Sequence, residues 1–201
     1  MPRTEEQFSE MREKTKQKIL ENALLLFAEK GFKGTSINDI AKSAGISKGL
    51  AYNYFKSKYD LMISVLKLIE EEFSRLLIAL NNENDPYKKL TLMITLTIEM
   101  LQRDEKFWSL YMNFAFQSEV KEEAQNLMGD SLKILFNLIE KIFVEVGVKN
   151  PVEESKILGA ILDGISFHYI IEKEKYPIDK VKTYLLQKYS KSELSKSILQ
   201  K

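Results

Sequence analysis

The sequence of 201 residues has no cysteine, one histidine, eight glycines and four prolines. The lack of cysteine excludes disulfides, thiolate metal ligands and cysteine nucleophiles together, and it suits a reducing compartment, of which the cytoplasm is the simplest. So few glycines and prolines leave little material for turns, while 44% hydrophobic residues suffice for a packed core. We therefore expect one or two compact domains built from long helices.

Long apolar runs are also missing. The longest, residues 157–171, is interrupted by Asp163 and falls short of the roughly 20 residues that cross a bilayer. The first 16 residues are rich in charge and have no apolar stretch of the kind found in secretory signals. We predict no membrane span and no membrane partner.

Catalytic side chains are scarce as well. His168 is the only histidine, and although Asp163 or Glu172 could lie near it, one imidazole and one carboxylate form neither a catalytic triad nor a closed metal site. We predict that the protein is not an enzyme and that it holds no metal and no cofactor. His168 is expected to be buried and hydrogen-bonded in a helix of a dimer interface.

Apolar residues recur at helical spacing almost throughout the chain, and no stretch alternates as a strand would. Glycine, proline and polar tracts such as residues 81–85 separate the periodic segments. We predict an all-α fold of about nine helices, with residues 190–201 fraying at the end. The expected helices cover residues 12–30, 37–44, 48–55, 57–80, 86–102, 105–117, 119–146, 151–174 and 178–189.

Three short-range signals predict a helix, a turn and a second helix between residues 36 and 55. Ser36 and Asp39 fit a capping box, in which each side chain binds the backbone N–H of the other residue. Gly45 can take the left-handed conformation that ends a helix, and Ser47 can cap the next one. Residues 48–55 make only two turns, too few for a stable isolated helix, so packing on neighbouring helices has to select it.

Charge is unevenly distributed around this segment. Residues 30–58 contain six lysines and one aspartate, a net charge of +5, in a chain whose total is +1. If Ile46, Ala51 and Phe55 pack inward, the exposed side carries groups that can read bases or hold phosphates in a DNA major groove. That exposed set is Lys48, Gly49, Leu50, Tyr52, Asn53 and Tyr54. Phosphates would repel acidic side chains, which explains why residues 46–58 contain none.

Residues 27–61 contain short motifs in a fixed order: F-x-x-x-G-(F/Y), T-(S/T)-(I/V), D-I-A, G-(I/V)-S-K-G, Y-x-Y-F and S-K-x-x-L. The matching positions are Phe27, Gly31, Phe32, Thr35, Ser36, Ile37, Asp39, Ile40, Ala41, Gly45 to Gly49, Tyr52, Tyr54, Phe55, Ser57, Lys58 and Leu61. On these motifs, residues 12–61 resemble the N-terminal domain of the tetracycline-repressor-like (TetR) family of bacterial transcription regulators. The resemblance covers about a quarter of the chain. Ala51 departs from the larger aliphatic residue that is usual there, which predicts looser packing beneath the second helix.

The resemblance implies a helix-turn-helix DNA-binding domain over residues 1–56 and a helical effector-binding and dimerisation domain over residues 57–201. It also implies a homodimer that binds a double-stranded operator with an inverted repeat. Most often in this family such a regulator is a repressor, which a small effector releases from the operator. Phosphate contacts would come from Thr35, Ser36, Tyr52, Tyr54 and Lys58. The positions that face bases would be Lys48, Gly49, Leu50 and Asn53.

Aromatic and methionine side chains gather in the region where the family holds its effector, and few charges fall among them. We predict a small, largely apolar effector, with one polar group met by Tyr111, Asn113 or Gln117. Ordinary core packing of the same residues is the alternative. The candidate effector residues are Met93, Met100, Phe107, Trp108, Tyr111, Phe114 and Phe136.

Small residues in an apolar helix permit close approach between helices, and residues 151–174 have this pattern. As the resemblance implies, we predict that this helix and the last one form half of a four-helix bundle across a two-fold axis. Burial within one subunit is the alternative. The candidate interface residues are Gly159, Ala160, Asp163, Gly164, Phe167 and His168.

Two other classes of function stay open for this sequence. A helical carrier of apolar molecules would have the basic segment without specific DNA binding. An all-helical enzyme would need the nucleophiles and bases that the sequence lacks. Specific retention on promoter DNA at physiological salt would separate a regulator from a carrier.

Overall fold

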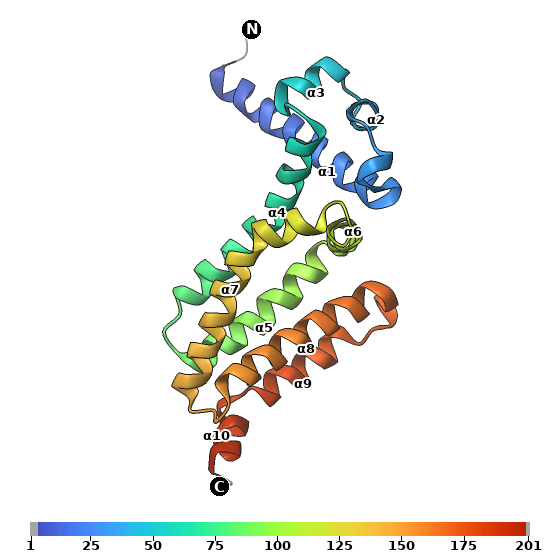
Figure 1. Ribbon diagram of the computed structural model, residues 1–201. Helices are drawn as coiled ribbons and strands as arrows, with labels where there is room; N and C mark the ends of the chain where they lie inside the picture. The colour runs from blue at the N-terminus through green and yellow to red at the C-terminus, as the bar shows by residue number, and fades with distance from the viewer. Residues whose placement is uncertain (1–3, 200–201) are drawn as a thin grey trace. The chain divides into compact units, whose positions relative to one another are not determined.

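The computed structural model describes residues 4–199 as ten α-helices and one short 3-10 helix, with no strand in that range (Figure 1). The all-α prediction is confirmed. The helices are α1 (Glu5–Gly34), α2 (Ile37–Ser43), α3 (Lys48–Tyr54), α4 (Lys58–Asn81), α5 (Pro86–Arg103), α6 (Glu105–Ala115), α7 (Lys121–Val146), α8 (Pro151–Glu172), η1 (Lys173–Lys175), α9 (Ile178–Lys188) and α10 (Lys191–Leu199).

Helix boundaries differ from the prediction at both ends of the chain. α1 begins at Glu5 rather than near residue 12, because Thr4 and Gln7 form a capping box there. At the other end α10 occupies the segment that was expected to fray, and Leu194 anchors it by joining the hydrophobic core. Gly31 interrupts α1 with a φ of +77°, a conformation that favours glycine, and one more turn follows to Gly34.

Contacts divide the chain into two compact units. The first, here called the head, contains the residues up to Glu70 together with Ser109–Leu127. The second, here called the body, contains Glu71–Trp108 and the residues from Met128 on. Helices α4, α6 and α7 each contribute to both units. The sequence predicted a boundary between residues 56 and 57, which separates a DNA-binding domain from an effector-binding domain. That division is defined by function and stays a prediction.

The core of the head is centred on Phe27 of α1. This side chain is fully buried and stacks on Phe114 of α6, with ring centroids 5.2 Å apart and planes 14° apart. Burying one phenylalanine contributes about 1.5–3 kcal/mol, so the pair does much to hold the end of α6 in the head. The short helices α2 and α3 pack through Ile37, Ala41 and Ala51. This burial of one face selects the two-turn helix α3, as predicted.

The body has its own core, to which α4, α5, α7, α8, α9 and α10 contribute. α5 packs against both α8 and α9, and α9 also contacts α10 (Figure 1). Leu90, Ile94 and Ile98 recur every four residues along α5 and are buried, which is why that helix faces the core along its length. Among residues 4–199, no helix combines the length and the apolar character needed to cross a membrane.

Candidate nucleic-acid interface and effector region

The solvent face of α3 brings the candidate base-reading residues together. The hydroxyl of Ser47 accepts a hydrogen bond from the backbone N–H of Leu50 at 3.1 Å and so caps the helix, as predicted. Ala51 and the following Phe55 are buried. The side chains that remain exposed on this helix are Lys48, Leu50, Tyr52 and Asn53, together with Gly49.

Gly49 leaves open space above the helix. A β-carbon at this position would meet no atom of the protein within 4 Å. The protein's own packing therefore gives no reason for glycine here, whereas a bound molecule could approach the backbone closely. The ammonium of Lys48 lies 5.9 Å from the ring centre of Tyr52, so cation and aromatic ring occupy the same face.

Ser36, which precedes α2, and Tyr54, the last residue of α3, are two further candidate phosphate contacts. Ser36 is exposed and forms the predicted capping box with Asp39, whose backbone N–H it receives at 3.2 Å. The hydrogen bonds from Ser36 lower the pKa of the Asp39 carboxyl. Tyr54 is half-buried, and the guanidinium of Arg12 lies 5.9 Å from its ring centre.

Thr35 and Lys58 have structural roles inside the head. Thr35 is 2% exposed, and its hydroxyl lies within hydrogen-bond distance of the carbonyl oxygens of Leu26 and Gly31, at 3.0 and 2.9 Å. The ammonium of Lys58 donates to the carbonyl oxygens of Phe32 and Thr35 at 2.8 and 2.9 Å. These bonds fasten the start of α4 to the end of α1. The hydroxyl of Thr35 is thus withdrawn from the surface, and Lys58 retains one of its three N–H donors.

One of the three side chains expected to meet a polar group of the effector ties the head together. Gln117 follows α6; its carbonyl oxygen accepts the backbone N–H of Phe32 at 2.9 Å, and its amide donates to the carbonyl oxygen of Phe27 at 2.7 Å. The contact satisfies backbone groups beside the break at Gly31. No sequence motif signals it, because the partners lie 85 and 90 residues away.

The candidate effector residues divide between the two units. Tyr111 and Phe114 belong to the head, where both are buried, and burial raises the pKa of Tyr111 to about 12. In the body, the indole N–H of Trp108 donates to the carbonyl oxygen of Met100 at 2.9 Å. Met93 is fully buried in the body, while the others there are half-buried. Those half-buried residues are Met100, Phe107, Trp108 and Phe136.

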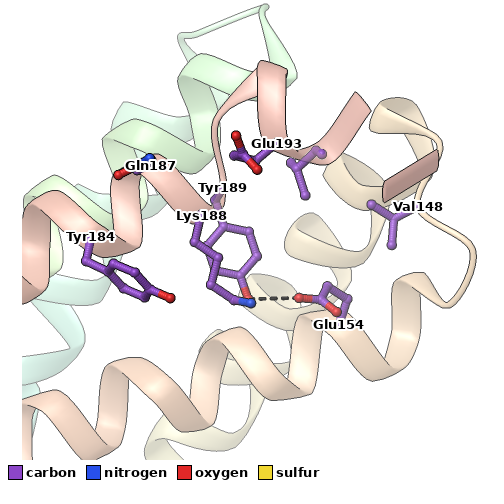
Figure 2. A pocket seen from close by; sticks show the side chains of 8 residues that line it. Val148, Glu154, Tyr184, Gln187, Lys188, Tyr189 and Glu193 are labelled. Carbon is purple, nitrogen blue, oxygen red and sulfur yellow. Dashed lines mark hydrogen bonds between the residues drawn. The ribbon is translucent and has the colours of Figure 1, made fainter. Parts of the chain in front are cut away.

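The body also has a cleft of about 420 Å³ near its C-terminal end (Figure 2). In it Tyr189 donates a hydrogen bond to Glu154 at 2.8 Å, and burial raises the pKa of this tyrosine. The lining combines polar and apolar groups and contains none of the candidate effector residues. The residues that line it are Val148, Glu154, Tyr184, Gln187, Lys188, Tyr189, Glu193 and Leu194.

Five of the six candidate interface residues lie on the side of α8 that no other described part of the chain covers, here called its open side. Ala160, Asp163, Phe167 and His168 are exposed, and a β-carbon on Gly164 would meet nothing within 4 Å. Gly159 differs, because a β-carbon there would stand 2.8 Å from the ring of Phe136 in the same chain. Gly159 thus leaves room on α8 for the ring of Phe136 from α7.

His168 is exposed in the single chain, so its burial in a dimer interface stays a prediction. Its ring is exposed and lies 3.2 Å from a carboxylate oxygen of Glu172, with the ring of Tyr176 stacked at 6.2 Å. Ile157 and Ile171 are also exposed, at 48% and 60%, and extend the open apolar side of α8 beyond the predicted residues. Within residues 4–199, no three metal-ligating side chains come together.

Comparison with known proteins relates both units to transcription regulators. The family model described as bacterial regulatory proteins, tetR family, matches residues 19–65, the segment that carries the α3 surface. IcaR of Staphylococcus aureus, the negative transcriptional regulator of the biofilm operon icaADBC, is 30% identical over 142 residues, which are 69% of this chain and 75% of IcaR. YuxN of Bacillus subtilis, an HTH-type transcriptional regulator, is 30% identical over 164 residues, which are 80% of this chain and 55% of YuxN.

Among solved structures, FadR of Bacillus subtilis in complex with stearoyl-CoA has the same fold. It superposes with a TM-score of 0.66 at 21% identity, and the match covers 86% of this chain and 96% of FadR. The likeness to IcaR likewise reaches well beyond the helix-turn-helix segment, since its 142 aligned residues exceed residues 19–65. This chain therefore belongs to the tetR family of bacterial regulatory proteins.

Proposed function

We propose that this chain is a transcriptional repressor that binds an inverted-repeat operator as a homodimer and leaves it when a small, largely apolar effector binds. The observation that carries the proposal is the acid-free solvent face of α3, where Lys48, Gly49 and Asn53 are exposed together. A protein that only carried apolar molecules would have no use for such a face.

On the operator, α3 would lie in the major groove. Lys48 can donate to guanine and Asn53 can pair with adenine, while Gly49 and Leu50 allow close apposition to base edges. Tyr52 and Tyr54 could donate hydroxyl hydrogen bonds to phosphates. Ser36 could do so only by giving up the hydrogen bond that its hydroxyl donates to the Asp39 carboxylate. Lys58 could add one phosphate contact through its remaining N–H, whereas Thr35 would act from inside the head by holding its shape.

Dimerisation would proceed through the open side of α8. Ile157, Phe167 and Ile171 are exposed along this helix, and Ala160 and Gly164 between them would let a partner helix approach. A two-fold axis would present two copies of α3 to the DNA. The operator half-sites would then be centred about 34–36 Å apart, or a multiple of that distance.

Release would depend on α4 and α6, which each run from one unit into the other. An effector held among Met100, Phe107 and Trp108 would shift α6, and Gln117 would pass that shift to the end of α1. Allosteric coupling of about 1–3 kcal/mol lowers operator affinity roughly 5- to 150-fold, and operator DNA must weaken effector binding by the same factor.

Selection of duplexes from a random pool tests the DNA-binding part. We expect the purified chain to enrich an inverted repeat at physiological salt, and the variant Asn53→Ala to enrich a more degenerate one. Failure of the wild type to enrich any sequence would favour the carrier alternative. Enrichment of a single half-site without its inverted partner would contradict the dimer.

The effector part is tested with stearoyl-CoA as the first probe, because FadR binds it. Trp108 is the only tryptophan, so its fluorescence reports on occupancy. We expect a probe that quenches Trp108 to weaken binding to the selected duplex by the factor above. A probe that saturates the quenching and leaves operator affinity unchanged would contradict the coupling.

A further inference from the structure

The first half of α1 precedes the segment that the family model matches, and its two sides differ in charge. One side carries acidic residues at helical spacing, namely Glu6, Glu10, Glu13 and Glu21. Another side has no acidic residue and follows a spacing of three and four. That acid-free stripe consists of Phe8, Met11, Thr15, Lys18 and Asn22.

The acid-free stripe lies toward the helix-turn-helix. Asn22 accepts a hydrogen bond from the hydroxyl of Ser43, at the end of α2, at 2.6 Å. One turn earlier, the ammonium of Lys18 lies beside the turn between α2 and α3, 3.7 Å from where a β-carbon of Gly45 would stand. Arg12, which flanks the stripe, has its guanidinium over the ring of Tyr54 at the end of α3. The stripe is therefore continuous with the candidate DNA surface.

These side chains are also available to a partner. Phe8 and Met11 are 57% and 43% exposed, and Arg12 and Lys18 are exposed as well. In the described part of the chain neither of these two cations forms an ion pair. By contrast Lys14, one turn before Lys18, pairs with Glu10 at 2.6 Å.

We propose that Phe8, Met11, Arg12 and Lys18, here called the α1 edge, bind the DNA backbone just outside the major-groove segment that α3 occupies. The inference rests on the proposed function of α3. Arg12 and Lys18 are six residues apart, about 9 Å along the helix axis, which matches two to three phosphates of one strand at about 3.4 Å of axial rise each. Phe8 and Met11 cover sugar carbons between these contacts. A second copy of the chain fits less well, because it would bring like charges together.

The test measures how binding to a mixed-sequence 40-base-pair duplex depends on salt. Each phosphate contact contributes about 0.9 to the slope of log affinity against log salt. The double variant Arg12→Gln/Lys18→Gln should lower the magnitude of this slope by about 1.8. When salt is raised from 50 to 200 mM, the affinity of the double variant should therefore fall by a factor about 12 times smaller than that of the wild type. Lys14→Gln removes a neighbouring charge of α1 that is already paired with Glu10, and it should leave the slope unchanged. Lys48→Ala serves as the positive control for α3.

The outcomes separate this inference from the proposed function. A wild type that does not bind the duplex would overturn both. A slope that falls with Lys48→Ala but not with the double variant would overturn the α1 edge alone, as would equal losses in the double variant and Lys14→Gln. If the double variant loses its helical circular dichroism, the single variant Arg12→Gln, exposed on α1, should lower the slope by about 0.9. An unchanged slope in that folded variant would equally overturn the inference.

Discussion

The head and the body both expose large apolar side chains, but beside different neighbours. In the head, Leu50 and Tyr52 stand next to Lys48 on a helix without any acidic residue. In the body, Phe167 and Ile171 follow the open side of α8, which has no lysine or arginine beyond Lys156. An apolar side without cations can be buried against a copy of itself, whereas one that carries cations needs a polyanion. The charge near an exposed apolar group therefore indicates which kind of partner would cover it.

The largest effect is expected from an aromatic residue inside the head. Phe27→Ala removes a ring that is fully buried and stacked on Phe114, and it should lower the free energy of unfolding by about 3–5 kcal/mol. Phe116→Ala is the matched control, because this ring of the same unit is 74% exposed. Urea unfolding followed by circular dichroism measures both. Equal, small losses would show that the Phe27 stack does not hold the head together.

The exposed aromatic of the body should affect association rather than folding. Phe167→Asp places a charge on the open side of α8 and should weaken the dimer by at least about 2 kcal/mol, roughly 30-fold or more in dissociation constant. Its unfolding as a monomer should change little, because the ring is already half-exposed. Analytical ultracentrifugation compares it with Val144→Asp, an exposed residue of α7. A dimer that survives Phe167→Asp would place the interface elsewhere.

Two lysines of the head should separate DNA reading from head stability. Lys48→Ala should lose about 1–3 kcal/mol of discrimination between matched and mismatched duplexes and leave unfolding unchanged. Lys58→Ala leaves the carbonyl oxygens of Phe32 and Thr35 without their donor, so it should lower the free energy of unfolding by about 1–3 kcal/mol. Duplex competition and urea unfolding of both variants give the result. Loss of discrimination in Lys58→Ala without loss of stability would reverse the two roles.

The smallest effect is expected from pH. A hydrogen bond from Lys33 is the main cause that lowers the pKa of Glu119 in the head from 4.5 to about 2. Because the folded-state pKa is depressed, this stabilisation is complete above the ordinary pKa and is lost as pH falls toward about 2. Burial raises the pKa of Tyr189 in the body above 10, so its contribution is lost instead as pH rises past that value.

Variants separate these two limbs of the pH profile. Glu119→Gln should flatten the dependence of urea unfolding on pH in the acid range, and Tyr189→Phe should flatten it in the alkaline range. An acid limb that is unchanged in Glu119→Gln would show that other carboxylates account for it.

The helix-turn-helix could be predicted because its signals are short-range. The capping box of Ser36 and Asp39, the left-handed Gly45 and the cap at Ser47 each join residues no more than three or four apart, and all are present. The exposed face of α3 followed from the same reasoning, since burying Ala51 and Phe55 leaves only one side for solvent. The long helices of the body were likewise foreseen from apolar spacing.

Roles that depend on distant partners could not be foreseen. The motif that contains Lys58 predicts a phosphate contact, yet the Lys58 ammonium donates hydrogen bonds to carbonyl oxygens 23 and 26 residues away in the sequence. Gln117 fits an effector contact, yet it binds the backbone near Gly31. Gly159 and Gly164 look alike in the sequence, and only the position of Phe136 distinguishes the packed glycine from the open one.

The sequence by itself determined the all-α fold, the helix caps and the acid-free face of α3, because each depends on residues within a few turns of one another. Tertiary structure alone decided which polar side chains stay free for a partner. A donor such as Lys58 binds whichever acceptor the fold brings within hydrogen-bond distance. The positions of the two residues in the sequence do not indicate how close they lie in the folded chain.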